Sequence, residues 1–323
     1  MDRHLGVDLG ATNVVSVAVD DGGRLLGRAT ADRDADDAAA IRATLLATAR
    51  AAREDADVDP ADVATVGIAA AGPLDVEAGA AVDPPNVDGV DRIDLIDPLS
   101  DRFADATVAL FNDAAAGALG ERYVADRSAE NLVYLTVSSG IGAGVVVDDR
   151  VLRGHRAGAG EVGHMTVDPD GGRRCGCGGV GHWEAYSGGA NLPGVAADLA
   201  AERDLETDLP LSDPGFDAAD VYDLAGDDPL ATLVVERATA YNVVGVVNVV
   251  QAYAPEVVAV GGGVALGSPE LVVDPLRERV PDRVLVEAPS IEPAALGEDA
   301  VALGASYGAR SDAGGSARPP TRS

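Results

Sequence analysis

The sequence predicts an α/β protein built from two similar domains that face each other across a cleft. A strand–turn–strand–turn–strand pattern opens the chain at residues 4–30 and is repeated at residues 132–154. Between and after the two copies, strand-like segments run directly into helical ones, which is typical of α/β folds. With 323 residues, the chain is long enough for two domains or for one large α/β domain.

Each copy of the repeated pattern carries a turn of small residues at its tip. The first turn is GATN at residues 10–13, and the second lies within TVSSGIGAG at residues 136–144. Glycine lets backbone N–H groups approach an anion closely, and Thr12 or Ser139 adds a hydroxyl donor. A single turn of this kind is ordinary. The matched pair predicts two tips that grip a polyphosphate from both sides.

The remaining elements follow from local patterns. Residues 107–113 (TVALFND) read as a strand that runs into a helix, so Asn112 and Asp113 stand at its carboxyl end. Sheets of α/β proteins bind their ligands at this end, although an aspartate at such a junction is commonly only a helix N-cap. The other expected elements are an alanine-rich helix at 36–54, a buried strand at 65–72, short helical pieces within 190–229, a buried apolar helix at 230–253, a strand ending in three glycines at 255–264, and a closing helix at 296–310.

Residues 160–189 hold both cysteines and two of the four histidines of the chain. Soft ligands beside glycine turns indicate a metal site, although two cysteines in a glycine-rich loop could be incidental. Two carboxylates, Glu161 and Glu184, stand beside the donors, so the loop is expected to form a binding site. The four donors that could share one tetrahedral zinc ion are His164, Cys175, Cys177 and His182.

The charge balance excludes several classes of function. The chain has 54 acidic and 24 basic residues, a formal charge of −30, and every basic residue is arginine because the sequence contains no lysine. The acids are spread along the chain, which predicts a surface that stays hydrated in a halophilic cytoplasm; an acidic face for a basic partner would explain a local patch better. Such a charge disfavours nucleic-acid partners. The absence of lysine excludes a Walker-type phosphate loop.

The sequence also predicts a cytoplasmic location. The chain runs directly into a strand-like segment without a charged-then-apolar leader, so no secretion signal is expected. We find no apolar run that should span a membrane, and we expect no membrane association. The two cysteines are assigned to a metal and give no disulfide framework.

Taken together, these motifs resemble the ROK family of sugar kinases, a branch of the kinases with the actin-like ATPase (ribonuclease H-like) fold. The resemblance runs from Leu5 to about Arg310 and is specific when its motifs are taken together. The motifs are VDLGATN, GIAAAGPLD, PPN at residues 84–86, FNDAAAGALGE, TVSSGIGAG, GEVGHMTVDPDG with the Cys/His run after it, and VVAVGGGV.

The resemblance implies roles for individual residues. Asp113 is expected to be the general base on the sugar hydroxyl, and His164 to serve both as a zinc ligand and as a sugar contact. The implied sugar-binding residues are Asn86, Asn112, Asp113, Glu161, His164 and Glu184. The residues implied to surround ATP and Mg²⁺ are Asp8, Gly10, Thr12, Asn13, Ser139, Gly140, Gly142, Gly261, Gly262 and Gly263.

Four positions depart from the family pattern. His182 stands where a third cysteine is usual, which still leaves a legitimate tetrahedral zinc set of two cysteines and two histidines. Asn13 occupies a position that is commonly basic, and Ala115 one where many relatives carry a further asparagine. Ser139 replaces the usual threonine and keeps its hydroxyl. These departures concern affinity more than reaction type.

The resemblance implies an ATP-dependent hexokinase that phosphorylates glucose at the C6 hydroxyl, with Mg²⁺ and a structural Zn²⁺. The run EAYSGG favours glucose, while fructose, mannose and N-acetylhexosamines remain alternatives. A non-catalytic sugar sensor is the rival class. ROK repressors carry a DNA-binding domain ahead of the first phosphate loop, and here that loop begins by Asp8.

We also expect a homo-oligomer, either a dimer or a tetramer, and two domains of unequal size. The expected N-terminal domain covers residues 1–113 together with the closing helix at 296–310. The larger domain covers residues 114–295 and includes the zinc loop. Residues 311–323 are expected to form a disordered tail.

Overall fold

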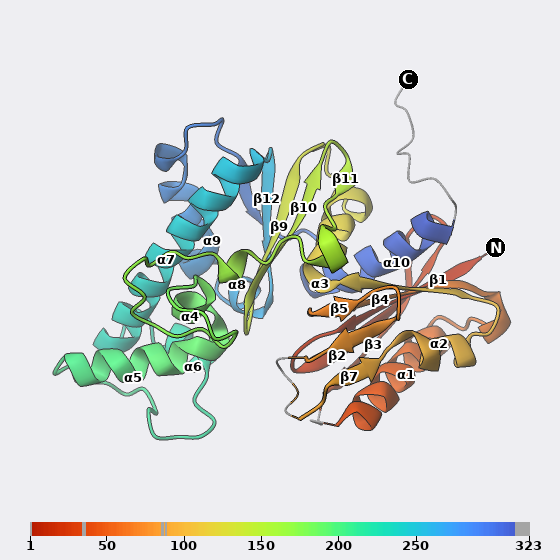
Figure 1. Ribbon diagram of the computed structural model, residues 1–323, viewed down its shortest axis with the longest axis horizontal. Helices are drawn as coiled ribbons and strands as arrows, with labels where there is room; N and C mark the ends of the chain where they lie inside the picture. The colour runs from red at the N-terminus through yellow and green to blue at the C-terminus, as the bar shows by residue number, and fades with distance from the viewer. Residues whose placement is uncertain (1, 34–36, 85–86, 88, 314–323) are drawn as a thin grey trace. The chain divides into compact units, whose positions relative to one another are not determined.

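The computed structural model divides the chain into two compact units (Figure 1). Unit 1 comprises Met1–Glu130, Gly144–Gly160 and Glu298–Ser323, and unit 2 comprises Asn131–Ala143 and Glu161–Gly297. Each of the two large sheets has five strands. The structure describes residues 2–33, 37–84, 87 and 89–313.

The sheet of unit 1 has the strand order β3-β2-β1-β4-β8. Strands β1, β2 and β3 are antiparallel neighbours, whereas β1, β4 and β8 run parallel. The predicted three-stranded meander is therefore confirmed, as are the two strands predicted after it. The strands are β1 (Arg3–Leu9), β2 (Asn13–Asp20), β3 (Leu25–Asp32), β4 (Val63–Ala70) and β8 (Thr107–Asn112).

Helix α10 (Ala300–Ala313) closes unit 1 and lies directly on its sheet. A Cβ atom at Gly6 in β1 would clash with the carbonyl oxygen of Ala302, and one at Gly67 in β4 with that of Ala305. This close approach requires glycine at both strand positions, and the predicted closing helix is confirmed. The other helices of unit 1 are α1 (Ala38–Asp55), α2 (Ile96–Arg102) and α3 (Asp113–Leu119), which continues into the π-helix η2 (Gly120–Val124).

Unit 1 extends past the boundary expected after residue 113. Helix α3 packs on α10 so closely that a Cβ atom at Gly304 would clash with the carbonyl oxygen of Ala116. The residues after α3 accordingly group with unit 1 as far as Glu130. Residues 311–313, expected to begin the tail, belong to α10, and the rest of that expected tail, 314–323, lies outside the described residues.

A small antiparallel sheet in unit 1, with the order β5-β6-β7, is not predicted from the sequence. Its strands have two or three residues each, which is too short for an alternating pattern to be recognised. They are β5 (Leu74–Asp75), β6 (Ala80–Val82) and β7 (Arg92–Asp94).

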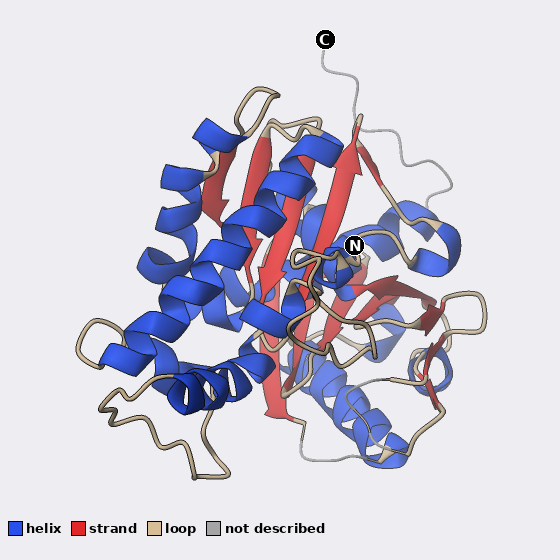
Figure 2. Ribbon diagram, turned by 60° about the vertical axis from the view of Figure 1, so that its left-hand side comes forward, coloured by secondary structure: helices blue, strands red, loops and turns tan. Residues whose placement is uncertain are grey.

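The second large sheet has the order β11-β10-β9-β12-β13, which repeats the order of the first sheet strand for strand. Strands β10 and β11 are antiparallel, and β9, β12 and β13 run parallel. The predicted repeat is confirmed, and Figure 2 shows the long strands of this sheet in red with helices alongside. The strands are β9 (Leu132–Val137), β10 (Ile141–Val147), β11 (Arg150–Val151), β12 (Val257–Gly261) and β13 (Ser290–Pro293).

Helix α7 (Pro229–Tyr253) is the core helix of unit 2. Among the described residues it is the one helix long and apolar enough to cross a membrane, yet 56% of its most apolar stretch is buried inside the protein. Trp183 packs on Gly245 of this helix and donates its indole N–H to Asn242 at 2.8 Å. The predicted buried helix is confirmed. The other helices of unit 2 are α4 (Glu184–Ser187), α5 (Leu192–Glu202), α6 (Ala218–Asp223), α8 (Gly263–Gly267) and α9 (Pro269–Arg279).

Candidate functional site

The carboxyl ends of β1 and β8 carry the acidic residues of the predicted site in unit 1. Asp8 lies near the end of β1, and Asp113 follows β8 as the first residue of α3. Strand β4 joins them, because its Ala69 pairs with Asp8 and its Ala70 with Asn112. Parallel strands end at one edge of a sheet, so Asp8, Asn112 and Asp113 meet at that edge.

Asn112, and not Asp113, caps helix α3. Its Oδ1 accepts a hydrogen bond from the N–H group of Ala115 at 3.0 Å, and its side chain is buried. An oxygen of Asp113 accepts a hydrogen bond from Ala114 at 2.8 Å. The capping role that an aspartate could fill here thus belongs to the asparagine. Asn86, also predicted to bind sugar, lies outside the described residues.

The two carboxylates of this edge have raised pKa values. Burial raises the pKa of Asp113 above its usual value, although the N–H group of Ala114 opposes the shift. Burial, with a contribution from the charge of Asp113, raises the pKa of Asp8 to about 8. A pair of neighbouring carboxylates suits a cation, and Mg²⁺ prefers oxygen ligands. The donor set therefore fits Mg²⁺, with Asp113 available as a proton acceptor.

The first glycine turn follows Asp8 and joins β1 to β2. The N–H group of Gly10 donates to the carbonyl of Asn13 at 2.9 Å, and Thr12 lies within the turn. The turn is held by Arg33, whose N–H group donates to Thr12 at 2.8 Å and whose Nη1 donates to the carbonyl of Gly10 at 3.3 Å. Sequence analysis missed Arg33. Only the register of β2 on β3, which pairs Asn13 with Asp32, could have indicated its place.

The second glycine turn lies at the matching position in unit 2, after β9. Ser139 and Gly140 stand between β9 and β10, and Gly142 lies in β10. The N–H group of Ser138 donates to the carbonyl of Gly140 at 2.9 Å, which closes the turn. The strand-for-strand repeat thus gives each unit one small-residue turn at the carboxyl end of its first strand.

Three glycines predicted on the nucleoside side lie beside this second turn. Gly261 ends β12 and pairs with Thr136 of β9, and Gly263 begins α8. Gly262 has a φ of +91°, and a Cβ atom there would lie 2.5 Å from the carbonyl oxygen of Val137. The two glycine segments therefore share one edge of the sheet, where α/β proteins bind nucleotides.

His164, Cys175, Cys177 and His182 converge in unit 2, with their ligand atoms all within 4.8 Å of one another. Sγ of Cys175 lies 3.6 Å from Nδ1 of His164, and Sγ of Cys177 lies 3.2 Å from Nδ1 of His182. A tetrahedral zinc ion, with bonds of about 2.3 Å to sulfur and about 2.0 Å to nitrogen, holds such ligands about 3.6 Å apart. The spacing and the donor types fit zinc.

Tight turns bring these donors together. The N–H group of Cys175 donates to the carbonyl of Gly179, and that of Gly178 donates to the carbonyl of Cys175, both at 2.9 Å. A Cβ atom at Gly179 would clash with the ring of His182, so a larger residue there would displace this ring. Burial raises the pKa of the Cys175 thiol to about 11. A bound cation is what would keep this sulfur as a thiolate.

Two glutamates flank the cluster of these four residues, hereafter the Cys/His cluster. His164 directs Nδ1 toward Cys175, and its Nε2 lies 3.9 Å from a carboxylate oxygen of Glu161. Glu184 accepts a hydrogen bond from the N–H group of Ile141 at 2.9 Å. Carboxylate and imidazole groups of this kind can bind sugar hydroxyls, and a carboxylate beside the outer nitrogen of a metal-bound histidine fixes its tautomer.

Comparisons with known proteins agree with this geometry. The sequence profile of the ROK family matches residues 4–311. The chain belongs to the ROK family. It is 34% identical over 307 residues to the glucokinase of Pyrobaculum calidifontis, covering 94% of each chain.

Solved structures extend the likeness of this ROK chain to the fold. A ROK family glucokinase from Streptomyces griseus, in complex with glucose and AMPPNP, has a TM-score of 0.80 and 29% identity, covering 95% of this chain and 99% of that one. The ROK hexokinase of Thermus thermophilus has a TM-score of 0.76 and 34% identity, covering 97% of this chain and 100% of that one. The predicted actin-like ATPase fold is confirmed.

The structure shows the surroundings of three residues that differ from the usual ROK pattern. Asn13 stands in the turn held by Arg33, so a cation lies close to a position that is commonly basic. Ala115 donates its N–H group to the cap residue Asn112. His182 takes the place of the usual third cysteine within the Cys/His cluster.

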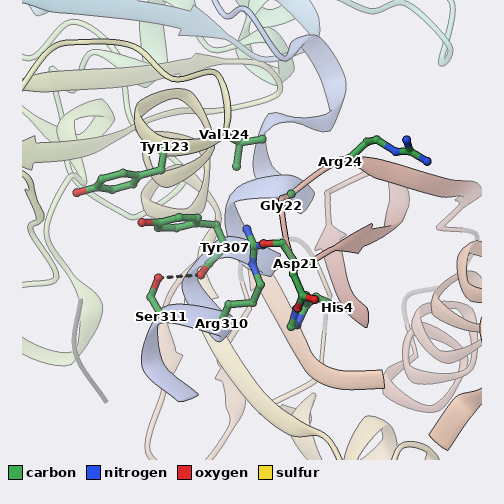
Figure 3. A pocket seen from close by; sticks show the side chains of 10 residues that line it. His4, Asp21, Gly22, Arg24, Tyr123, Val124, Tyr307, Arg310 and Ser311 are labelled. Atoms are coloured by element: carbon green, nitrogen blue, oxygen red, sulfur yellow. Dashed lines mark hydrogen bonds and ion pairs between the residues drawn. The ribbon is translucent and has the colours of Figure 1, made fainter. Parts of the chain in front are cut away.

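A separate cavity of about 550 Å³ lies in unit 1 at the opposite end of β1 from Asp8. Figure 3 shows His4 beside Asp21 and the stacked rings of Tyr123 and Tyr307. Polar side chains that line this cavity already bind other protein groups. Nε2 of His4 lies 3.1 Å from an oxygen of Asp21, and Arg310 donates to the carbonyl of Asp21 at 2.9 Å. The residues that line it include none of the predicted site residues.

Proposed function

We propose that this ROK protein is a kinase that transfers the γ-phosphoryl group of ATP to the C6 hydroxyl of glucose. The observation that carries the proposal is Asp113, a carboxylate with a raised pKa at the carboxyl end of β8, in a chain that matches a glucokinase along 94% of its length. Full-length likeness to the Thermus hexokinase supports the same reaction class.

Asp113 acts as the general base. It accepts the proton of the C6 hydroxyl while that oxygen forms a bond to the γ-phosphorus, and the bond from phosphorus to the bridging oxygen breaks to release ADP. Its raised pKa favours proton uptake. Phosphoryl transfer depends mainly on positioning and charge neutralisation. Mg²⁺, when bound, neutralises phosphate charge, and Asp8 would hold it.

The two glycine turns bind the phosphate groups of ATP. In unit 1 the residues are Gly10, Thr12 and Asn13, and in unit 2 Ser139, Gly140 and Gly142. Gly261, Gly262 and Gly263 bind the nucleoside side, which their place beside the second turn supports. Sugar hydroxyls are held by Asn86, Asn112, Asp113, Glu161, His164 and Glu184.

A structural zinc ion is held by the Cys/His cluster, whose spacing fits it. The ion takes no part in the transfer of the phosphoryl group. It closes the loop between Glu161 and Glu184, so that both carboxylates keep a fixed orientation toward the sugar.

The protein works in a salt-rich cytoplasm as a homo-oligomer and without nucleic-acid partners. The dispersed acidic excess and the absence of lysine support the salt-rich cytoplasm, and the net charge of −30 disfavours nucleic-acid partners. Raising the salt concentration from about 0.1 M to about 1 M shortens the Debye length from about 10 Å to about 3 Å and screens the self-repulsion. Melting temperature and activity should rise together over this range, and identical melting curves would contradict the halophilic adaptation.

A coupled assay of ADP formation, run in molar salt with Mg²⁺, tests the proposal. ATP is offered with glucose, fructose, mannose, N-acetylglucosamine or N-acetylmannosamine, and kcat/KM is compared. Glucose should give the highest value. Preference for another hexose would reassign the substrate within the class. Glucose binding in calorimetry without turnover for any sugar would instead identify a non-catalytic sensor.

A further inference from the structure

The side chain of Glu184 stands between the Cys/His cluster and the second glycine turn. Its Oε2 accepts a hydrogen bond from the N–H group of Ile141 at 2.9 Å, and its Oε1 lies 3.9 Å from Sγ of Cys175. It packs so closely on the turn that a Cβ atom at Gly140 would lie 2.6 Å from Oε2. One carboxylate therefore contacts both features.

The residues that follow Glu184 hold the same turn by its backbone. The N–H group of Gly189 donates to the carbonyl of Ser138 at 2.8 Å, and that of Ala190 donates to the carbonyl of Ser139 at 2.9 Å. The segment that leaves the cluster thus binds the turn at two carbonyl groups, while Glu184 binds it at an N–H group.

The other arm of the cluster contacts the end of the same turn. Gly163, which precedes His164, lies so close to Ile141 that a Cβ atom would clash with its carbonyl oxygen. Gly163 therefore packs against the carbonyl group of Ile141, and Glu184 accepts a hydrogen bond from its N–H group.

We propose that Glu184 is a positioning residue for the nucleotide, because it fixes the second glycine turn against the Cys/His cluster. The proposal rests on the proposed function, in which this turn binds phosphate, and adds a role beyond the sugar contact expected of Glu184. Backbone N–H groups bind an anion well only when their directions are fixed. A carboxylate that accepts a backbone N–H makes a charge-assisted bond, which is stronger than a neutral one.

The first test is titration calorimetry with AMPPNP and Mg²⁺, without sugar. Glu184→Ala removes the acceptor and should weaken binding about tenfold, the loss expected for a hydrogen bond to a charged group. Glu184→Gln retains the shape and one acceptor, so it should recover part of the affinity. Zinc content and melting temperature are measured on every variant, to separate loss of the bond from loss of the cluster.

Glu161→Ala is the matched control, since Glu161 flanks the same cluster through His164. It should weaken glucose binding and leave AMPPNP affinity unchanged. Wild-type AMPPNP affinity in folded, zinc-loaded Glu184→Ala would overturn the proposal. Equal losses of AMPPNP affinity in both alanine variants would also overturn it, because they would indicate general damage around the cluster.

The second test is hydrogen exchange at the Ile141 amide, which needs no nucleotide. Exchange should be faster in Glu184→Ala and Glu184→Gln than in the wild type, and unchanged in Glu161→Ala. Should Glu184→Ala prove unable to fold, Glu184→Gln carries the test, because it replaces a charge-assisted bond by a neutral one. Unchanged exchange in the glutamine variant would refute the inference. If the wild type binds no nucleotide, faster exchange would still show that Glu184 fixes the turn. The nucleotide-positioning role and the kinase function would then both be rejected.

Discussion

The two large sheets repeat one strand order, but their matching turns are held by side chains of opposite charge. In unit 1 the guanidinium of Arg33 donates to a carbonyl group of the first turn, at Gly10. In unit 2 the carboxylate of Glu184 accepts from an N–H group of the second turn, at Ile141. The repeated sheet sets where each turn lies. Side chains from outside the repeated strands, Arg33 and Glu184, determine how each turn is held.

The two units also carry different candidate chemistry. Unit 1 brings two carboxylates together, and both have raised pKa values. Unit 2 carries the Cys/His cluster at residues 164–182, with Glu161 and Glu184 beside it. In the proposed function, proton transfer belongs to unit 1 and the zinc-held glutamates belong to unit 2, so damage to each should have a different signature.

The largest effect is expected from Asp113→Asn in unit 1. The variant keeps the size and hydrogen-bonding capacity of the side chain but cannot accept the proton. Turnover should fall by about 10²-fold to 10⁴-fold, the range of general-base catalysis. Glucose affinity, measured by calorimetry, should change little.

The matched control for this variant is Asp8→Asn, which changes the other carboxylate of the pair. It should weaken Mg²⁺-dependent nucleotide binding, whereas Asp113→Asn should not. Near-wild-type turnover of Asp113→Asn would show that another group accepts the proton, and the division of labour between the units would be abandoned.

The next effect concerns the metal of unit 2. His182→Ala removes one of four ligands, so zinc measured after dialysis should fall well below one per chain, with at least about tenfold weaker metal binding. Glucose affinity should fall as well, because Glu161 and Glu184 lose their fixed orientation. His182→Cys should retain the metal, since it provides a third thiolate with no change in ligand number.

Two results would contradict the zinc assignment. One is active wild-type enzyme that contains no zinc. The other is His182→Ala with full zinc content and unchanged glucose affinity. Either result would show that these four side chains lie together through packing alone and do not form a zinc site.

The sequence predicted features that local patterns encode. Valine-rich strands and their turns gave the meander and its repeat, and the rarity of cysteine and histidine gave a cluster whose four donors do converge. It could not predict contacts that depend on register or turn geometry. Arg33 reaches Gly10 only through the pairing of β2 with β3, and Glu184 reaches Ile141 across 43 residues. The roles assigned to the site residues stay predictions.

A smaller effect is expected when one glycine of each unit is replaced by alanine, and the two replacements should differ in what they damage. Gly67→Ala in β4 forces a Cβ atom against the backbone of α10, which cannot move aside easily, so stability should fall by about 1–3 kcal/mol. Gly140→Ala meets only the flexible end of Glu184. It should lower nucleotide affinity with little loss of stability. Denaturant unfolding and calorimetry check both variants, and a larger stability loss for Gly140→Ala would reverse the comparison.

The smallest effect is a pH dependence of folding stability that arises from His4, near the start of β1. The two sheets differ again at this position. His4 in β1 pairs with Thr65, whereas the matching strands β9 and β12 pair Val133 with Val258. His4 is buried, with Nδ1 2.9 Å from the hydroxyl of Thr65, and burial lowers its pKa below 6.5 although a hydrogen bond with Asp21 opposes the shift.

The sign of this effect follows from where the proton binds first. Above pH 6.5 the imidazole is neutral in both states and His4 makes no difference, whereas below it the unfolded chain takes up the proton before the folded one. The free energy of unfolding should therefore decrease as the pH is lowered below 6.5, by at most about 1.4 kcal/mol per pH unit from this group. His4→Gln should be less stable than the wild type at pH 7 but lose less on acidification, and His155→Gln, at an exposed histidine, should behave as the wild type. Equal slopes for His4→Gln and the wild type, in denaturant unfolding at constant salt, would show that the His4 pKa is not lowered by folding.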